Sequence, residues 1–109
     1  MERRKEKVYF CENEKEWIEL LNFLQEDERN HWRAGSRPIY SDRIPIPYDK
    51  GEADAIFVDE EHNMTFSNIR YAKWWVQVNP RIDYEVYWVK DLKKAKSLAV
   101  RVKPNLPTI

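Results

Sequence analysis

One stretch limits the fold of this chain more than any other, because it predicts an amphipathic helix over residues 14–26. Its apolar residues recur at intervals of three and four, which gives one stripe on a helix and no pattern on a strand. They are Trp17, Leu20, Leu21 and Leu24. Asn13 is a favourable N-cap, and Glu16 follows three residues later, as in a capping box. One face of this helix is therefore expected to be buried in the core.

The chain of 109 residues is expected to form a single domain with its own core. Residues 1–7 read as a charged arm and residues 104–109 as a tail. Residues 37–50 hold three of the six prolines and predict a rigid, extended loop, because proline removes a backbone donor and pushes its neighbour toward extended geometry.

Several short apolar runs predict β-strands around this helix. They cover residues 8–11, 54–58, 64–69, 84–89 and 98–102, and the second and third form an antiparallel hairpin. Residues 70–79 fit either a helix or a strand, because a short aromatic run does not settle the period. The predicted fold is α+β, with one main amphipathic helix packed on a mostly antiparallel sheet of four or five strands.

Charge is balanced over the whole chain but not along it. The net charge is zero, whereas residues 12–61 carry 14 acids and 6 bases and residues 62–109 carry 3 acids and 9 bases. Two electrostatically distinct surfaces are therefore expected, and a mimic of DNA is disfavoured because it needs a dense negative field. No run of 18 apolar residues follows the charged N-terminus, so secretion and membrane spanning are disfavoured.

The sequence offers no assembled catalytic or metal site. His31 and His62 lack a ligand spacing, and the single cysteine, Cys11, lies in an apolar strand where it reads as a core thiol. Acids between residues 49 and 61 could supply a carboxylate pair, although a solvated hairpin explains them more simply. The glycine-rich phosphate loops and the nucleophile elbow are absent from the sequence. We therefore expect neither a cofactor nor a catalytic residue, and a protein that is not an enzyme.

Aromatic residues are the more informative feature, since five Trp and six Tyr exceed what one small core needs. Two groups are predicted to contact a protein partner: Tyr40, Ile44, Ile46 and Tyr48 in the proline-rich loop, and Tyr71, Trp74, Trp75 and Trp88 in the second half. The alternative is a nucleic-acid-binding surface, in which cations meet phosphate and rings stack on bases. It would use Arg70, Lys73, Trp74, Trp75, Lys93, Lys94 and Lys96. A third interpretation places Trp74 and Trp75 in the core.

The order of elements resembles that of small phage and prophage accessory proteins. A short strand and an amphipathic helix are followed by Trp32-x-x-Gly35, a variable loop, and strands around residues 56–58 and 64–66. The resemblance implies an intracellular binding protein that acts stoichiometrically on a host protein in the bacterial cytoplasm. Inhibition of a bacterial defence system is one such action, and self-association into a homo-oligomer stays open.

Overall fold

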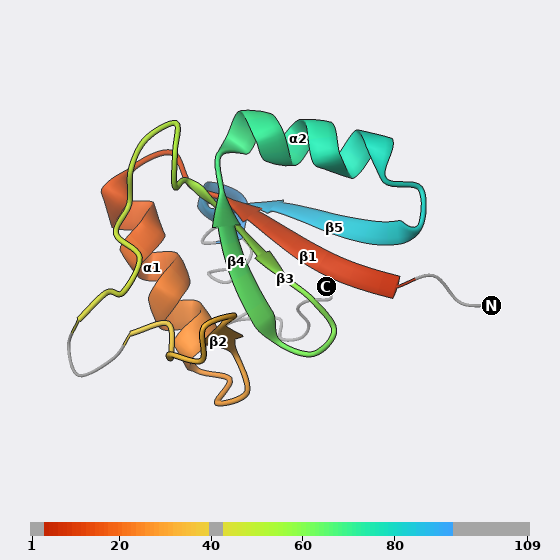
Figure 1. Ribbon diagram of the computed structural model, residues 1–109. Helices are drawn as coiled ribbons and strands as arrows, with labels where there is room; N and C mark the ends of the chain where they lie inside the picture. The colour runs from red at the N-terminus through yellow and green to blue at the C-terminus, as the bar shows by residue number, and fades with distance from the viewer. Residues whose placement is uncertain (1–3, 40–42, 93–109) are drawn as a thin grey trace, which may run out of the picture.

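The computed structural model describes residues 4–39 and 43–92, which form a five-stranded mixed sheet with one helix on each face (Figure 1). The strands are β1 (Arg4–Phe10), β2 (His31–Trp32), β3 (Ala55–Val58), β4 (Asn63–Ser67) and β5 (Ile82–Trp88). Their order across the sheet is β2-β4-β3-β1-β5. β3 pairs antiparallel with β1 and β4, whereas β1–β5 and β2–β4 are parallel pairs.

The first helix, α1 (Glu14–Gln25), covers one face of the sheet. Its stripe of apolar residues is buried together with Tyr9, Ile56 and Met64, which point to this face. The Asn13 side chain accepts a hydrogen bond from the Glu16 amide at 2.9 Å, as the sequence predicts. The Glu16 carboxylate accepts in turn from the Glu12 amide at 2.7 Å, one residue earlier than in a regular capping box.

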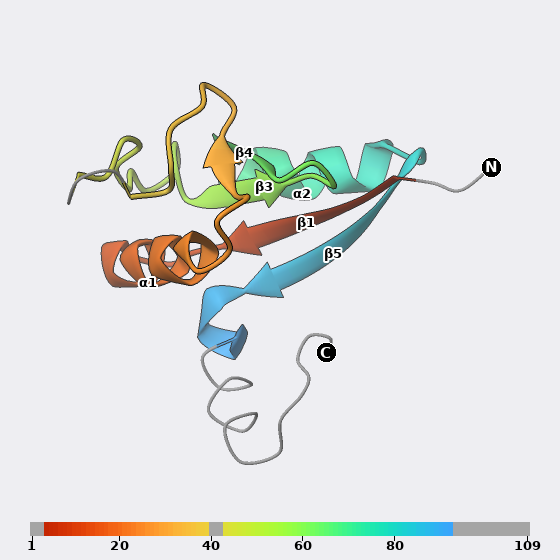
Figure 2. The ribbon, with the colours of Figure 1, turned by 90° about the horizontal axis from the view of Figure 1, so that it is seen from below.

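The second helix, α2 (Ile69–Val78), covers the opposite face. Val8, Phe10, Ala55 and Phe57 alternate with the residues that face α1, and they form a second core with Ala72 of α2. Figure 2 shows the sheet between the two helices. Residues 70–79, whose periodicity fits either a helix or a strand, are therefore helical as far as Val78.

The α+β class, four of the predicted strands and the 54–69 hairpin are confirmed, whereas the short strand β2 was not predicted. The expectation of a mostly antiparallel sheet is wrong, because four strands run in one direction and β3 alone opposes them. The cause is α2, since a helix between two strands returns the chain to the end where it started and lets β4 and β5 run parallel. The expectation of one main helix is also wrong, because α2 is a second helix that packs on the sheet.

The charged arm is shorter than predicted. β1 begins at Arg4, and its first residues, Arg4 to Lys7, pair with Ile82 to Glu85 of β5. Backbone pairing in a sheet tolerates charged side chains where these reach solvent, so hydropathy alone placed the start of the strand too late. The expected strand at residues 98–102 and the tail lie outside the described residues.

Candidate functional site

The outer side of α2 exposes three large apolar side chains. Trp74 is 52% exposed, Tyr71 48% and Val78 47%, and the three lie at helical spacing on one side. The ring centroids of Tyr71 and Trp74 are 5.6 Å apart. We name these three residues the α2 surface. Exposed apolar residues that adjoin one another often mark an interaction site, whereas isolated ones do not.

The helix that carries the α2 surface is fixed at its N-terminus. The Asn68 side chain accepts from the Tyr71 amide at 2.7 Å, and the buried Asp54 carboxylate accepts from the Ile69 amide at 2.8 Å. A carboxylate is favourable here because the N-terminal end of a helix carries partial positive charge. Ala72 is fully buried against the sheet. The position of Asp54 corrects the prediction that the acids of this region are solvated.

The predicted cations on α2 are exposed, but the predicted tryptophans differ in their environments. Arg70 and Lys73 are both exposed and lie close to Trp74 in the helix. Trp75 and Trp88 are half-buried and pack against the second core. The Lys73 ammonium lies 5.3 Å from the centre of the Trp88 ring, within the range of a cation–π contact. Lys93, Lys94 and Lys96 lie outside the described residues.

The predicted contact residues of the proline-rich loop pack against the core between α1 and the sheet, which we call the first core. Ile44, Ile46 and Tyr48 are partly buried there. The Trp17 indole donates a hydrogen bond to the Ile46 carbonyl at 2.9 Å, and its ring meets the Tyr48 ring edge to face. These three side chains therefore support α1. Tyr40 lies outside the described residues.

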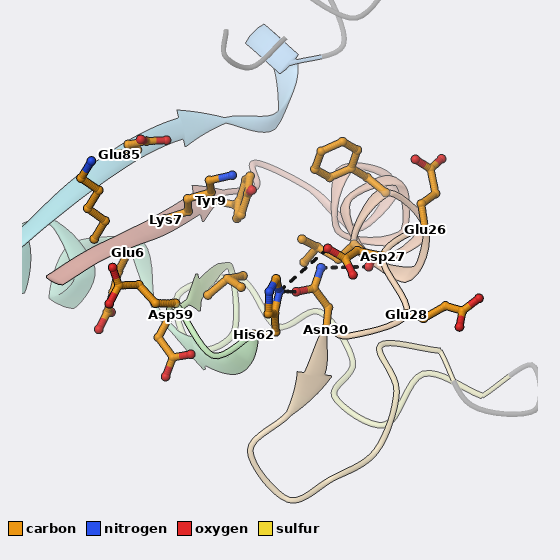
Figure 3. A pocket seen from close by; sticks show the side chains of 15 residues that line it. Glu6, Lys7, Tyr9, Glu26, Asp27, Glu28, Asn30, Asp59, His62 and Glu85 are labelled. Carbon is orange, nitrogen blue, oxygen red and sulfur yellow. Dashed lines mark hydrogen bonds and ion pairs between the residues drawn. The ribbon is translucent and has the colours of Figure 1, made fainter. Parts of the chain in front are cut away.

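A cleft of about 700 Å³ lies at the C-terminal end of α1, over the part of the sheet that this helix leaves open (Figure 3). Tyr9 and Phe23 line it together with acidic side chains from three places. These are Glu26, Asp27 and Glu28 near the end of α1, Asp59 and Glu60 after β3, and Glu6 and Glu85 on the sheet. Sequence reasoning missed this cleft, although the acidic runs at residues 26–28 and 59–61 were a signal for it.

The carboxyl groups of the cleft have pKa values that are shifted in different directions. Hydrogen bonds from Arg29 lower the pKa of Asp27 to about 2. Burial and the nearby Asp59 carboxylate raise the pKa of Glu6. Burial also acts on Asp59, but hydrogen bonds from the backbone amides of Asn63 and Glu61 outweigh it and lower the pKa of that group.

A buried amide joins the two walls of the cleft. The His62 ring donates from Nδ1 to the Asn30 side-chain oxygen at 3.0 Å, and Asn30 donates to the Leu24 carbonyl at 3.0 Å. The same His62 nitrogen lies 3.9 Å from the Asp27 carboxylate. Because an amide oxygen only accepts, this geometry places the His62 proton on Nδ1. The turn after β3 is thus tied to the end of α1.

Comparison of the chain with protein-family models, with curated proteins and with solved structures finds no match. Among the described residues, no group of three or more His, Cys, Asp and Glu side chains could hold a metal ion. None of the described helices is long and apolar enough to cross a membrane.

Proposed function

We propose that this chain is a small binding protein that acts stoichiometrically on a host macromolecule through the α2 surface. The observation that carries the proposal is the adjoining, exposed pair Tyr71 and Trp74 on a helix whose other side is packed. Trp and Tyr are frequent anchors of protein interfaces, because they bury a large area at a low cost in side-chain entropy.

The attachment of α2 to the sheet supports this use of its outer side. Asn68 and Asp54 satisfy amides at the start of the helix, and Ala72 brings its backbone close to the sheet. A surface that is fixed before binding loses little conformational entropy when the complex forms. The resemblance to phage accessory proteins adds the proposal that the partner is a host protein, one of a defence system included.

The test is capture from a bacterial host lysate by immobilised protein, followed by quantitative mass spectrometry. Tyr71→Ala with Trp74→Ala should remove the captured partner, whereas Ile18→Ala should retain it. Ile18 is a matched control because it is 38% exposed on the other helix, α1. A partner that all three proteins retain equally would refute the α2 surface as the binding site.

A second candidate function is the binding of single-stranded nucleic acid by the same helix. The observation in its favour is that Arg70 and Lys73 are exposed beside Trp74, while α2 contains no acidic residue. Cations beside an exposed ring suit a phosphate backbone with bases that stack.

Fluorescence anisotropy of labelled oligonucleotides at two salt concentrations separates the two candidates. Nucleic-acid binding should weaken steeply with salt and be lost in Arg70→Ala with Lys73→Ala, but not in Lys15→Ala with Lys50→Ala. No binding at low salt would remove the second candidate.

A further inference from the structure

β5 forms one edge of the sheet, and its outer side pairs with no other strand in the part of the chain that the structure describes (Figure 2). The strand is seven residues long, and Val86 near its middle is 45% exposed. Backbone groups along such an edge can pair with a further strand, and lysine and proline are the residues that most often prevent this. β5 contains neither of them. The edge is therefore a candidate docking site for a strand.

The two sides of β5 differ in chemistry. Tyr84 and Trp88 pack against the second core on the side of α2, and Val86 lies between them on the same side because strand residues alternate. The other side carries Glu85, whose carboxylate accepts a hydrogen bond from the Tyr87 hydroxyl at 2.6 Å. An incoming strand therefore has to present apolar residues on the side of α2, and no acid opposite Glu85.

β5 itself meets this requirement when it runs in the opposite direction. With Val86 opposite Val86 of a second copy, Tyr84 lies opposite Trp88 on one side, and Glu85 lies opposite Tyr87 on the other. The last two pairs each occur twice, because two identical antiparallel strands are related by a two-fold axis. Pairs of apolar or aromatic residues across strands are favourable, and a phenol hydroxyl can donate to a carboxylate.

We propose that the open edge of β5 is the interface of a homodimer, in which two copies of this strand pair antiparallel about a two-fold axis at Val86. The axis is perpendicular to the sheet, so the side of α2 stays the same side in both copies and the two sheets join into one. An axis at Glu85 would set two Glu85 carboxylates directly opposite each other, and like charges at such positions are destabilising. The charge of the strand therefore favours the axis at Val86.

The dimer has a consequence for host binding, and this step rests on the proposed function. Because the axis is perpendicular to the sheet, both α2 helices lie on the same side of the joined sheet. Two α2 surfaces then belong to one particle, and a host macromolecule that is itself dimeric can contact both. The second contact becomes intramolecular, which raises the overall affinity without a new kind of contact. Self-association is measured on the purified chain alone, so its failure is distinct from a failure of the α2 surface.

Sedimentation equilibrium of the full chain between about 1 and 100 µM tests the interface. The wild-type chain should show a concentration-dependent equilibrium between monomer and dimer. Val86→Lys sets two ammonium groups opposite each other and should weaken association at least about tenfold. Phe66→Lys is the matched control and should leave association unchanged, because Phe66 is 48% exposed on β4, which β3 and β1 separate from β5.

Disulfide formation in a glutathione redox buffer tests the register. Val86→Cys should join two chains through position 86 at least about tenfold more readily than Glu85→Cys joins them through position 85. The reason is that an axis at Val86 places only the position-86 thiols directly opposite each other, at a separation that a disulfide spans. The native Cys11 is fully buried, and burial raises its pKa, so it should not compete.

Three results in sedimentation would overturn the proposal. They are a monomer at every concentration, a dimer that Val86→Lys leaves as strong as wild type, and an equal loss of the dimer in Val86→Lys and Phe66→Lys. Cross-linking that is as strong in Glu85→Cys as in Val86→Cys, or stronger, would refute the register argued from charge.

Discussion

Arg37 is expected to stabilise the C-terminal end of α1, although it lies twelve residues beyond the last residue of that helix. Its guanidinium donates to the backbone carbonyls of Gln25 at 2.7 Å, Asp27 at 3.2 Å, Glu28 at 2.8 Å and Asn30 at 2.6 Å. The last turn of α1 contains no basic residue. Arg37 therefore supplies the positive charge that the carboxyl end of a helix favours.

The cost of Arg37→Ala follows from these contacts. Three of the four hydrogen bonds are partly buried, and each is worth about 1 kcal/mol net, so the free energy of unfolding should fall by about 3 kcal/mol. Arg37→Lys keeps the charge but cannot reach four carbonyls from one nitrogen. It should recover only about 0.3–1 kcal/mol through the helix dipole.

Urea unfolding followed by tryptophan fluorescence and far-UV circular dichroism measures this change. The midpoint should fall in the order wild type, Arg37→Lys, Arg37→Ala, with an unchanged slope. Lys15→Ala is a control, because Lys15 is an exposed residue of the same helix, so its midpoint should stay near that of wild type. If Arg37→Ala unfolds within about 0.5 kcal/mol of wild type, water satisfies these carbonyls and the reasoning is wrong.

Three further outcomes test the core and the cleft. Trp17→Ala should destabilise the fold by about 3–5 kcal/mol in urea, since its side chain is fully buried, whereas the half-exposed Trp74 should cost far less when changed to alanine. Hydrogen bonds from Arg29 lower the pKa of Asp27 from its ordinary value of 3.8 to about 2, so this carboxylate stabilises the fold above pH 4 and the contribution is lost toward pH 2. The difference in stability between wild type and Asp27→Asn in pH-dependent unfolding should therefore shrink over that range. Glu6 has the opposite sign, because its pKa is raised from 4.5 in the fold: Glu6→Gln should be more stable than wild type at pH 7, and this gain should vanish below pH 4.5.

The sequence predicted most reliably those features that depend on neighbouring residues. α1, its Asn13 cap and the hairpin of β3 and β4 are such features, and each agrees with the structure. Their signals lie within a few residues, in the spacing of apolar side chains and in capping chemistry, so the rest of the fold need not be known. The burial of Cys11 also follows from its apolar strand.

The candidate site could be predicted only in part. The sequence singled out Tyr71, Trp74 and Trp75 together, but the structure places two of them on the outer side of α2 and the third against the second core. A run of adjacent rings does not say which ring faces the sheet until the helix is placed on it. The cleft was missed because its acids come from the segment after α1, the turn after β3, and two strands.

What the sequence by itself determined, then, is the amphipathic first helix, the antiparallel hairpin, the α+β class and the surplus of aromatic residues. Tertiary structure alone decided that residues 69–78 are helical, that β1 and β5 run parallel, and which rings are exposed. The physical reason is that a short apolar run is stable as helix or strand according to the surface that covers it. For α2 that surface is the sheet face formed by Val8, Phe10, Ala55 and Phe57, which lie a dozen or more residues away in the chain.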